Sequence, residues 1–132
     1  MHSVIWEGGI AIVDDEKVII ELYNIIFRMK GIPVTFIAYD GEEAVRKFRE
    51  SSPRPQVMIM DYRMPIMDGV EAARTILSLE PDTKIIFVSA DTGAREEAMK
   101  AGAAAFLEKP AGLKEIIDQV EKVMSQKSTI VK

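Results

Sequence analysis

The stretch VMIMDYRMPIMDG, residues 57–69, opens with four apolar residues and runs directly into Asp61. A short, continuous apolar run bounded by turn residues is typical of a strand that is buried on both faces. Asp61 therefore either turns the chain at the end of this strand or is a group that the strand presents for chemistry. The rest of the chain has to decide between these two interpretations.

Four more apolar runs have the same character, and helix-like segments separate them. The runs are IAIVD (10–14), PVTFIA (33–38), KIIFVSA (84–90) and AAFLEK (104–109). Between the runs, apolar residues recur at the spacing of an amphipathic helix. The clearest sets are Val18, Leu22, Ile25, Ile26 and Met29, and then Leu113, Ile116, Ile117, Val120 and Val123; weaker sets are Ala44 and Phe48, then Val70, Ala73 and Leu77, and finally Ala94, Ala98 and Ala101.

Alternation of buried strands with helices predicts an α/β fold. Such a chain forms a parallel, doubly wound sheet with right-handed crossovers and with helices on both faces. The common strand order for five strands is 2-1-3-4-5, and we expect that order here. Gly31, Gly102 and Pro81 lie where three of the helices should end.

Composition limits the classes of function. The 132 residues suit one domain, and the absence of cysteine excludes disulfides, thiolate metal sites and thiol nucleophiles. With 48% apolar residues, 29% charged residues and a net charge of −4, the chain is typical of a soluble globular domain, which we expect in the cytoplasm. It has no dense basic run and no membrane-length apolar stretch, so we expect neither direct nucleic-acid binding nor a membrane partner.

The strand–helix pattern places one domain at residues 9–125, with an extension at 1–8 and a tail at 126–132. No output segment follows residue 125. We therefore expect a stand-alone protein that acts through protein contacts, with a domain excised from a longer chain as the alternative.

Polar residues cluster at the carboxyl ends of four strands, the edge at which open α/β sheets bind ligands. The first strand ends in Asp14 and Asp15, the third in Asp61, the fourth in Ser89 and the fifth in Lys109. Three adjacent carboxylates repel one another unless a hard divalent cation such as Mg²⁺ or Ca²⁺ binds between them. A metal, a lysine and a hydroxyl together stabilise phosphoryl oxygens, and a carboxylate can accept the phosphoryl group. This combination predicts phosphoryl transfer onto Asp61.

Each of these residues also has a simpler explanation. Asp14 or Asp15 could cap a helix that begins near Glu16. Ser89 could be a turn or capping residue, and Lys109 taken alone suits a solvated strand end. The set of residues, rather than any single one, favours the chemical interpretation.

Four motifs in register resemble the receiver domain of two-component response regulators, of the chemotaxis-regulator type. They are IVDDE (12–16), DYRMPIMDG (61–69), VSA (88–90) and FLEKP (106–110). The resemblance covers about residues 9–125 and implies a flavodoxin-like (βα)5 fold. It also implies that Asp61 is the phosphoacceptor and that Asp14, Asp15, Asp61 and the backbone carbonyl of Arg63 bind Mg²⁺.

The resemblance assigns further roles. Lys109 would pair with the phosphoryl group, and Ser89 would follow it as a switch residue. Phe106 would rotate between exposed and buried positions, and the Lys109–Pro110 peptide bond would be cis. Arg63 and Asp91 occupy positions that tune the lifetime of the phosphoryl group in similar domains. The loop from Asp61 would turn through Pro65 and Gly69 into the third helix.

The resemblance also implies the partners. Because His2 is the only histidine, the phosphodonor would be another protein, a histidine kinase or a phosphotransfer protein. Phosphorylation would change the surface of helix four, strand five and helix five, which a downstream protein or output domain then binds. The chain would be a monomer or a phosphorylation-dependent dimer, and it would catalyse only its own phosphorylation and dephosphorylation.

Three other functions compete with this interpretation. A phosphohydrolase of the haloacid-dehalogenase type also forms an aspartyl phosphate, but it carries D-x-D on its first strand and a cap insertion, which this sequence lacks. A flavin-binding protein needs a phosphate cradle where this chain has DDEK (14–17). A third alternative is an interaction module that keeps the fold but is never phosphorylated. Such a module would not need all five polar residues, Asp14, Asp15, Asp61, Ser89 and Lys109.

Overall fold

The structure is a computed structural model that describes residues 5–64 and 66–125. Its elements alternate as predicted. They are β1 (Ile10–Val13), α1 (Lys17–Met29), β2 (Val34–Ala38), α2 (Gly41–Glu50), β3 (Val57–Met60), α3 (Gly69–Leu79), β4 (Lys84–Ser89), the 3-10 turn η1 (Thr92–Ala94), α4 (Arg95–Lys100), β5 (Ala105–Glu108) and α5 (Leu113–Ser125). His2, Pro65 and residues 126–132, each named in an expectation above, lie outside the described residues.

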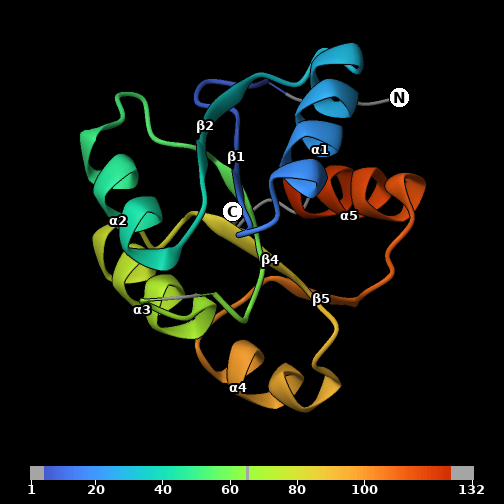
Figure 1. Ribbon diagram of the computed structural model, residues 1–132. Helices are drawn as coiled ribbons and strands as arrows, with labels where there is room; N and C mark the ends of the chain where they lie inside the picture. The colour runs from blue at the N-terminus through green and yellow to red at the C-terminus, as the bar shows by residue number, and fades with distance from the viewer. Residues whose placement is uncertain (1–4, 65, 126–132) are drawn as a thin grey trace, which may run out of the picture.

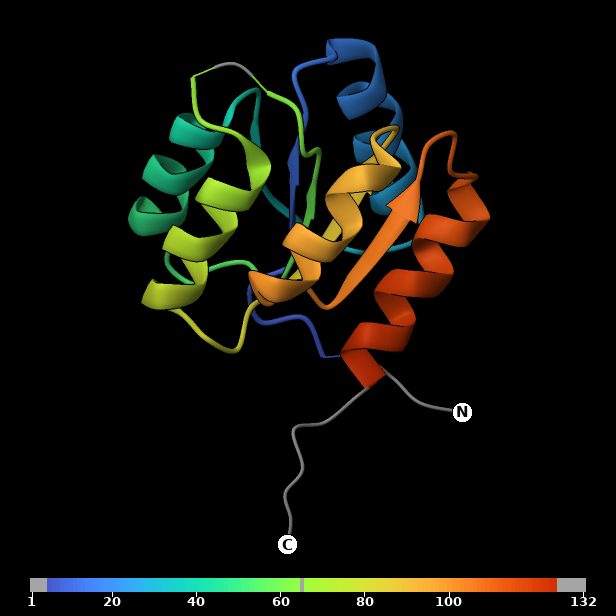
Figure 2. The same ribbon diagram turned by 90° about the horizontal axis from the view of Figure 1, so that it is seen from below.

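The five strands form one parallel sheet in the order β2-β1-β3-β4-β5, which confirms the predicted fold class and strand order. Helices cover both faces of this sheet (Figures 1 and 2). Side chains of α1 and α5 pack on one face around Ile10 and Ile12 of β1. Side chains of α2, α3 and α4 pack on the other face around Ala11 and Val13. Consecutive strand residues thus point to opposite faces, and both faces are buried.

The first helix forms where the pattern predicts it, but most of the apolar residues that make up the pattern do not face the core. Ile20, Tyr23 and Phe27 are buried against the sheet. Val18, Leu22, Ile25 and Met29 are instead exposed, with fractional exposures of 75%, 42%, 56% and 77%, and Ile26 is partly buried. The helix is apolar on more than one face, so spacing alone could not show which face packs on the sheet.

The strands end slightly earlier than predicted, and this difference positions the site. Asp14, Asp61 and Lys109 were expected inside strands, but each lies directly after one. The register pairs Val13 with Met60, so Asp14 and Asp61 leave neighbouring strands at the same level. The backbone N–H of Asp61 donates to the carbonyl of Val13 at 3.0 Å, which fixes this arrangement.

The amino-terminal end of the described chain is attached to the domain. Oε1 of Gln56 accepts hydrogen bonds from the N–H groups of Glu7, Gly8 and Gly9 at 2.9, 3.1 and 3.3 Å. Nε2 of Gln56 donates to the carbonyl of Ile5 at 3.2 Å. The side chain of Gln56 therefore binds residues 5–9 next to β3. The hydroxyl of Thr35 on β2 also donates to the carbonyl of Gly8, and the backbone N–H of Gln56 donates to the carbonyl of Gly9 at 2.8 Å. In the part of the chain that the structure describes, no helix combines the length and apolar character of a membrane span.

Candidate functional site

Three carboxylates converge at the carboxyl edge of the sheet. Asp14, Asp15 and Asp61 each present an oxygen, and these oxygens lie within 4.8 Å of one another. Asp14 and Asp61 are buried, with exposures of 4% and 8%, whereas Asp15 is exposed. Hard oxygen donors at this separation suit a divalent cation such as Mg²⁺, which also keeps several water ligands.

Lys109 joins this group from the end of β5. Its Nζ lies 3.1 Å from Oδ2 of Asp14 and 3.7 Å from Oδ1 of Asp61. The Lys109–Pro110 peptide bond is cis. Glu16 also lies 3.8 Å from Nζ, a contact that the sequence analysis did not identify although Glu16 belongs to the IVDDE motif.

Burial and like charges perturb the two inner carboxyl groups. Burial, and then the charge of Asp14, raise the pKa of Asp61 from 3.8 to about 6, although Lys109 opposes the shift. Burial also raises the pKa of Asp14, against a hydrogen bond of 2.9 Å from the N–H of Glu16 and the charge of Lys109. Burial lowers the pKa of Lys109, but the two carboxylates raise it more, so the net shift is upward. The site carries excess negative charge that a cation would balance.

Ser89 ends β4 and is buried at 1% exposure. Its Oγ accepts a hydrogen bond of 3.1 Å from the N–H of Asp91. Ser89 lines a shallow depression together with Asp61 and Lys109, whose other lining residues are Glu16, Arg63, Ala90 and Asp91. Residues at the carboxyl ends of β3, β4 and β5, together with Glu16 ahead of α1, therefore line one small depression.

The loop after Asp61 has a tight return into α3. A Cβ on Gly69 would lie 2.3 Å from the carbonyl oxygen of Asp61, so only glycine fits at this close approach. Asp68 caps α3 by accepting from the N–H of Glu71 at 2.9 Å. The side chain of Arg63 forms an ion pair of 2.5 Å with Asp91 across the depression.

Phe106 lies inside the domain, with 4% of its surface exposed. The guanidinium group of Arg95 lies over its ring, 5.1 Å from the centroid. Arg95 also donates a hydrogen bond of 3.3 Å to the carbonyl of Phe106. The sequence analysis did not identify Arg95, because a contact between two residues that belong to different elements leaves no local pattern.

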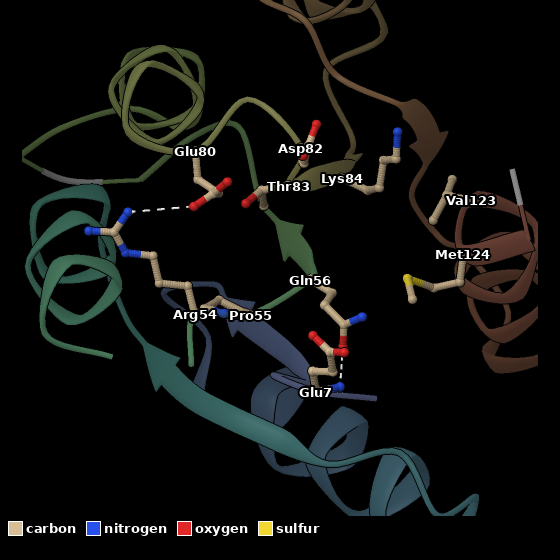
Figure 3. A pocket seen from close by; sticks show the side chains of 10 residues that line it. All are labelled: Glu7, Arg54, Pro55, Gln56, Glu80, Asp82, Thr83, Lys84, Val123 and Met124. Carbon is tan, nitrogen blue, oxygen red and sulfur yellow. Dashed lines mark hydrogen bonds and ion pairs between the residues drawn. The ribbon is translucent and has the colours of Figure 1, made fainter. Parts of the chain in front are cut away.

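A second pocket, of about 480 Å³, lies at the opposite edge of the sheet (Figure 3). Gln56 and Lys84, which line it, lie at the amino ends of β3 and β4, whereas Asp61 and Ser89 lie at the carboxyl ends. Its lining side chains partly neutralise one another, as in the 3.8 Å pair of Arg54 and Glu80 (Figure 3). None of the candidate site residues from the sequence analysis lines it.

Comparisons with known proteins agree with this geometry. The family model described as response regulator receiver domain matches residues 10–121. The chemotaxis protein CheY of Thermotoga maritima is 34% identical over 116 residues, which cover 86% of this chain and 95% of that protein.

Two solved structures are similar over most of their length. The CheX–CheY–BeF3–Mg complex of Borrelia burgdorferi aligns with a TM-score of 0.82 and 28% identity, covering 89% of each chain. The receiver domain of a sensor histidine kinase of Pseudomonas aeruginosa PAO1, with a magnesium ion coordinated in its active-site cleft, aligns with a TM-score of 0.78 and 29% identity, covering 90% of this chain and 99% of that one. With the acidic cluster at the carboxyl edge of a β2-β1-β3-β4-β5 sheet, these matches establish that the chain belongs to the response regulator receiver domain family.

Proposed function

We propose that Asp61 accepts a phosphoryl group from a phosphohistidine of a histidine kinase or phosphotransfer protein. The N–P bond of the donor breaks and a bond forms between phosphorus and a carboxylate oxygen of Asp61. The observation that carries the proposal is the convergence of Asp14, Asp15 and Asp61 within 4.8 Å beside the ammonium group of Lys109. The nucleophile must be ionised, and with a pKa of about 6 Asp61 is mostly ionised at neutral pH.

Mg²⁺ is the metal that suits this donor set. The carboxylates of Asp14, Asp15 and Asp61 and the backbone carbonyl of Arg63 would hold it, and when bound it offsets the charge of the phosphoryl oxygens. The magnesium ion in the related Pseudomonas receiver domain supports this choice. Lys109, already 3.7 Å from Asp61, pairs with the phosphoryl group as a fixed cation.

Phosphorylation then acts on Ser89 and Phe106. The Ser89 hydroxyl moves towards the phosphoryl oxygens, and Phe106 changes its position behind it. This biases a two-state equilibrium at the surface of α4, β5 and α5, which a downstream protein or an output domain binds. The receiver domain spans residues 9–125 in this proposal, works in the cytoplasm, and acts as a monomer or a phosphorylation-dependent dimer.

The exposed apolar face of α1 is the docking surface that we assign to the phosphodonor protein. Its members are Val18, Leu22, Ile25 and Met29. The face begins three residues after Asp15, at the edge of the sheet that carries Asp61. A protein seated on it would bring a histidine to Asp61 while it covers side chains that are otherwise in water.

Intact mass spectrometry after treatment with acetyl phosphate tests the phosphoacceptor. We expect the gain of one phosphoryl group in the presence of Mg²⁺, no gain after chelation, and no gain in Asp61→Asn. Asp82→Asn, which removes a carboxylate at the opposite edge, serves as the matched control and should react like the wild type. A gain that does not need metal, or an equal gain in Asp61→Asn, would overturn the proposal.

A further inference from the structure

Two side chains of the loop between β3 and α3 reach across to the segment that leads into α4. The phenol of Tyr62 donates a hydrogen bond of 2.9 Å to Oε1 of Glu97. The guanidinium group of Arg63 lies 2.5 Å from Oδ2 of Asp91 and 5.6 Å from the centroid of the Tyr62 ring. We call these four residues, Tyr62, Arg63, Asp91 and Glu97, the loop clasp.

Asp91 is the point at which this clasp meets the phosphorylation site. Its N–H donates to Oγ of Ser89 at 3.1 Å, and its carboxylate accepts from the N–H of Gly93 at 3.0 Å, which caps η1. Arg63 therefore contacts the carboxylate of Asp91, and Ser89 contacts its backbone N–H. A movement of either partner changes the contacts that fix the start of η1 and α4.

Arg63 is able to exchange partners. Its side chain is 74% exposed, so packing does little to hold it in one place. It also lines the same depression as Asp61 and Ser89. The phosphoryl group carries about 1.5–2 negative charges, which replace the single charge of the Asp61 carboxylate in that depression, and guanidinium groups bind phosphate through two parallel hydrogen bonds. The Asp91 carboxylate and the phosphoryl oxygens would therefore compete for one cation.

We propose that Arg63 is a positioning residue that leaves Asp91 for the phosphoryl group on Asp61 and thereby releases η1 and the start of α4. The inference rests on the proposed phosphorylation of Asp61. The inward movement of Ser89 removes the acceptor of the Asp91 N–H in the same event, so both routes act on Asp91. The hydrogen bond between Tyr62 and Glu97 is then the remaining link of the clasp, and it limits how far α4 moves.

Amide hydrogen exchange measured by NMR tests whether Arg63 moves from Asp91 to the phosphoryl group. Intact mass spectrometry gives the phosphorylated fraction of each sample. In the wild type, acetyl phosphate with Mg²⁺ should raise the exchange of the Gly93 and Ala94 amides by about two- to fivefold, the range that corresponds to the loss of an exposed ion pair. The Nε–H signal of Arg63 should shift in the same sample. In Arg63→Gln the exchange should be raised before phosphorylation and should change little on phosphorylation.

Further variants test the contacts of Arg63 and Tyr62 one at a time. Arg63→Lys keeps the charge without the paired hydrogen bonds and should restore part of the wild-type response, which a merely structural role would not predict. Tyr62→Phe should raise exchange in α4 while the response of Gly93 remains. Lys114→Gln is the matched control, because it breaks the exposed 2.8 Å pair with Asp118 on α5 and should leave the response unchanged.

Two results would overturn the inference while leaving the proposed function intact. One is a wild-type protein that gains the phosphoryl group without a change at Gly93. The other is an Arg63→Gln variant that, at equal phosphorylated fraction, responds as the wild type does. A wild type that gains no phosphoryl group would overturn the proposed function, and this inference with it.

Discussion

Nζ of Lys109 lies 3.1 Å from Oδ2 of Asp14, although the two residues are 95 positions apart in the sequence. The parallel sheet creates this pair by ending β1 and β5 at the same edge. The ammonium group also lies 3.7 Å from Asp61, so one cation partly neutralises two buried carboxylates. The protein thus holds excess negative charge at a partly buried site, and the stability changes expected for substitutions of Lys109 and Asp61 follow from that.

Lys109→Gln should lower the free energy of unfolding of the metal-free protein by about 1–3 kcal/mol at pH 7, because it leaves two buried carboxylates without their cation. The loss should shrink as the pH falls and these carboxyl groups take up protons. Chemical denaturation with chelator present measures it. Lys114→Gln, which removes a fully exposed ammonium group, should cost much less, and equal losses in the two variants would contradict the expectation.

Asp61→Asn should stabilise the metal-free protein at pH 7 by about 2–3 kcal/mol, since folding raises the pKa of Asp61 from 3.8 to about 6. Below about pH 4 the carboxyl group is protonated in both the folded and the unfolded chain, and it has no effect. Between about pH 4 and pH 6 the unfolded chain releases the proton first, so the wild type loses stability as the pH rises.

Denaturation from pH 4 to pH 8 in chelator should therefore show a gap between the variant and the wild type that opens through this range. Added Mg²⁺ should narrow the gap by stabilising the wild type. Asp82→Asn controls for the removal of a carboxylate elsewhere. A gap that does not depend on pH would argue against Asp61 as its source.

The paired change of Leu22→Gln and Ile25→Gln on α1 should slow phosphotransfer from a histidine kinase by about tenfold or more, because both residues lie in the middle of the docking face. Stability should change by no more than about 0.5 kcal/mol, since both side chains are already exposed. Phosphorylation by acetyl phosphate, which needs no docking, should stay at the wild-type rate.

A purified kinase that phosphorylates the wild-type chain provides the comparison. Met99→Gln on α4, where Met99 is 43% exposed, is the matched control for losing an exposed apolar side chain. If the α1 variant and Met99→Gln accept the phosphoryl group at the same rate, α1 is not the docking face.

Gln56→Ala should loosen residues 5–7, because three backbone N–H groups lose their common acceptor, while the carbonyls of Gly8 and Gly9 keep their donors. The cost in unfolding free energy should be about 1–3 kcal/mol. Trp6, the single tryptophan, packs partly buried against the core, so its fluorescence should shift to longer wavelength. Gln119→Ala on α5 is the control, and an unchanged Trp6 spectrum in Gln56→Ala would refute the assignment.

The sequence alone was sufficient to predict the strands and helices of the fold and the residues that gather at the site. Buried parallel strands give continuous apolar runs, and a polar residue directly after such a run stands out. For this reason Asp14, Asp61, Ser89 and Lys109 could be selected from the order of residues alone. The apolar spacing in α1 was a poorer guide, because the helix is apolar on two faces and only packing with the sheet decides that Ile20, Tyr23 and Phe27 are buried.

Local order along the chain thus determined the strands, the helices and the polar strand ends of this protein, since hydrogen bonding and side-chain periodicity act over a few residues. Only the tertiary structure decided that Lys109 lies between two carboxylates, that Arg63 pairs with Asp91, that Arg95 covers Phe106 and that Gln56 binds residues 5–9. These contacts join segments that lie 11 to 95 residues apart. Their geometry depends on how the whole sheet and its helices pack, and no local pattern in the sequence encodes it.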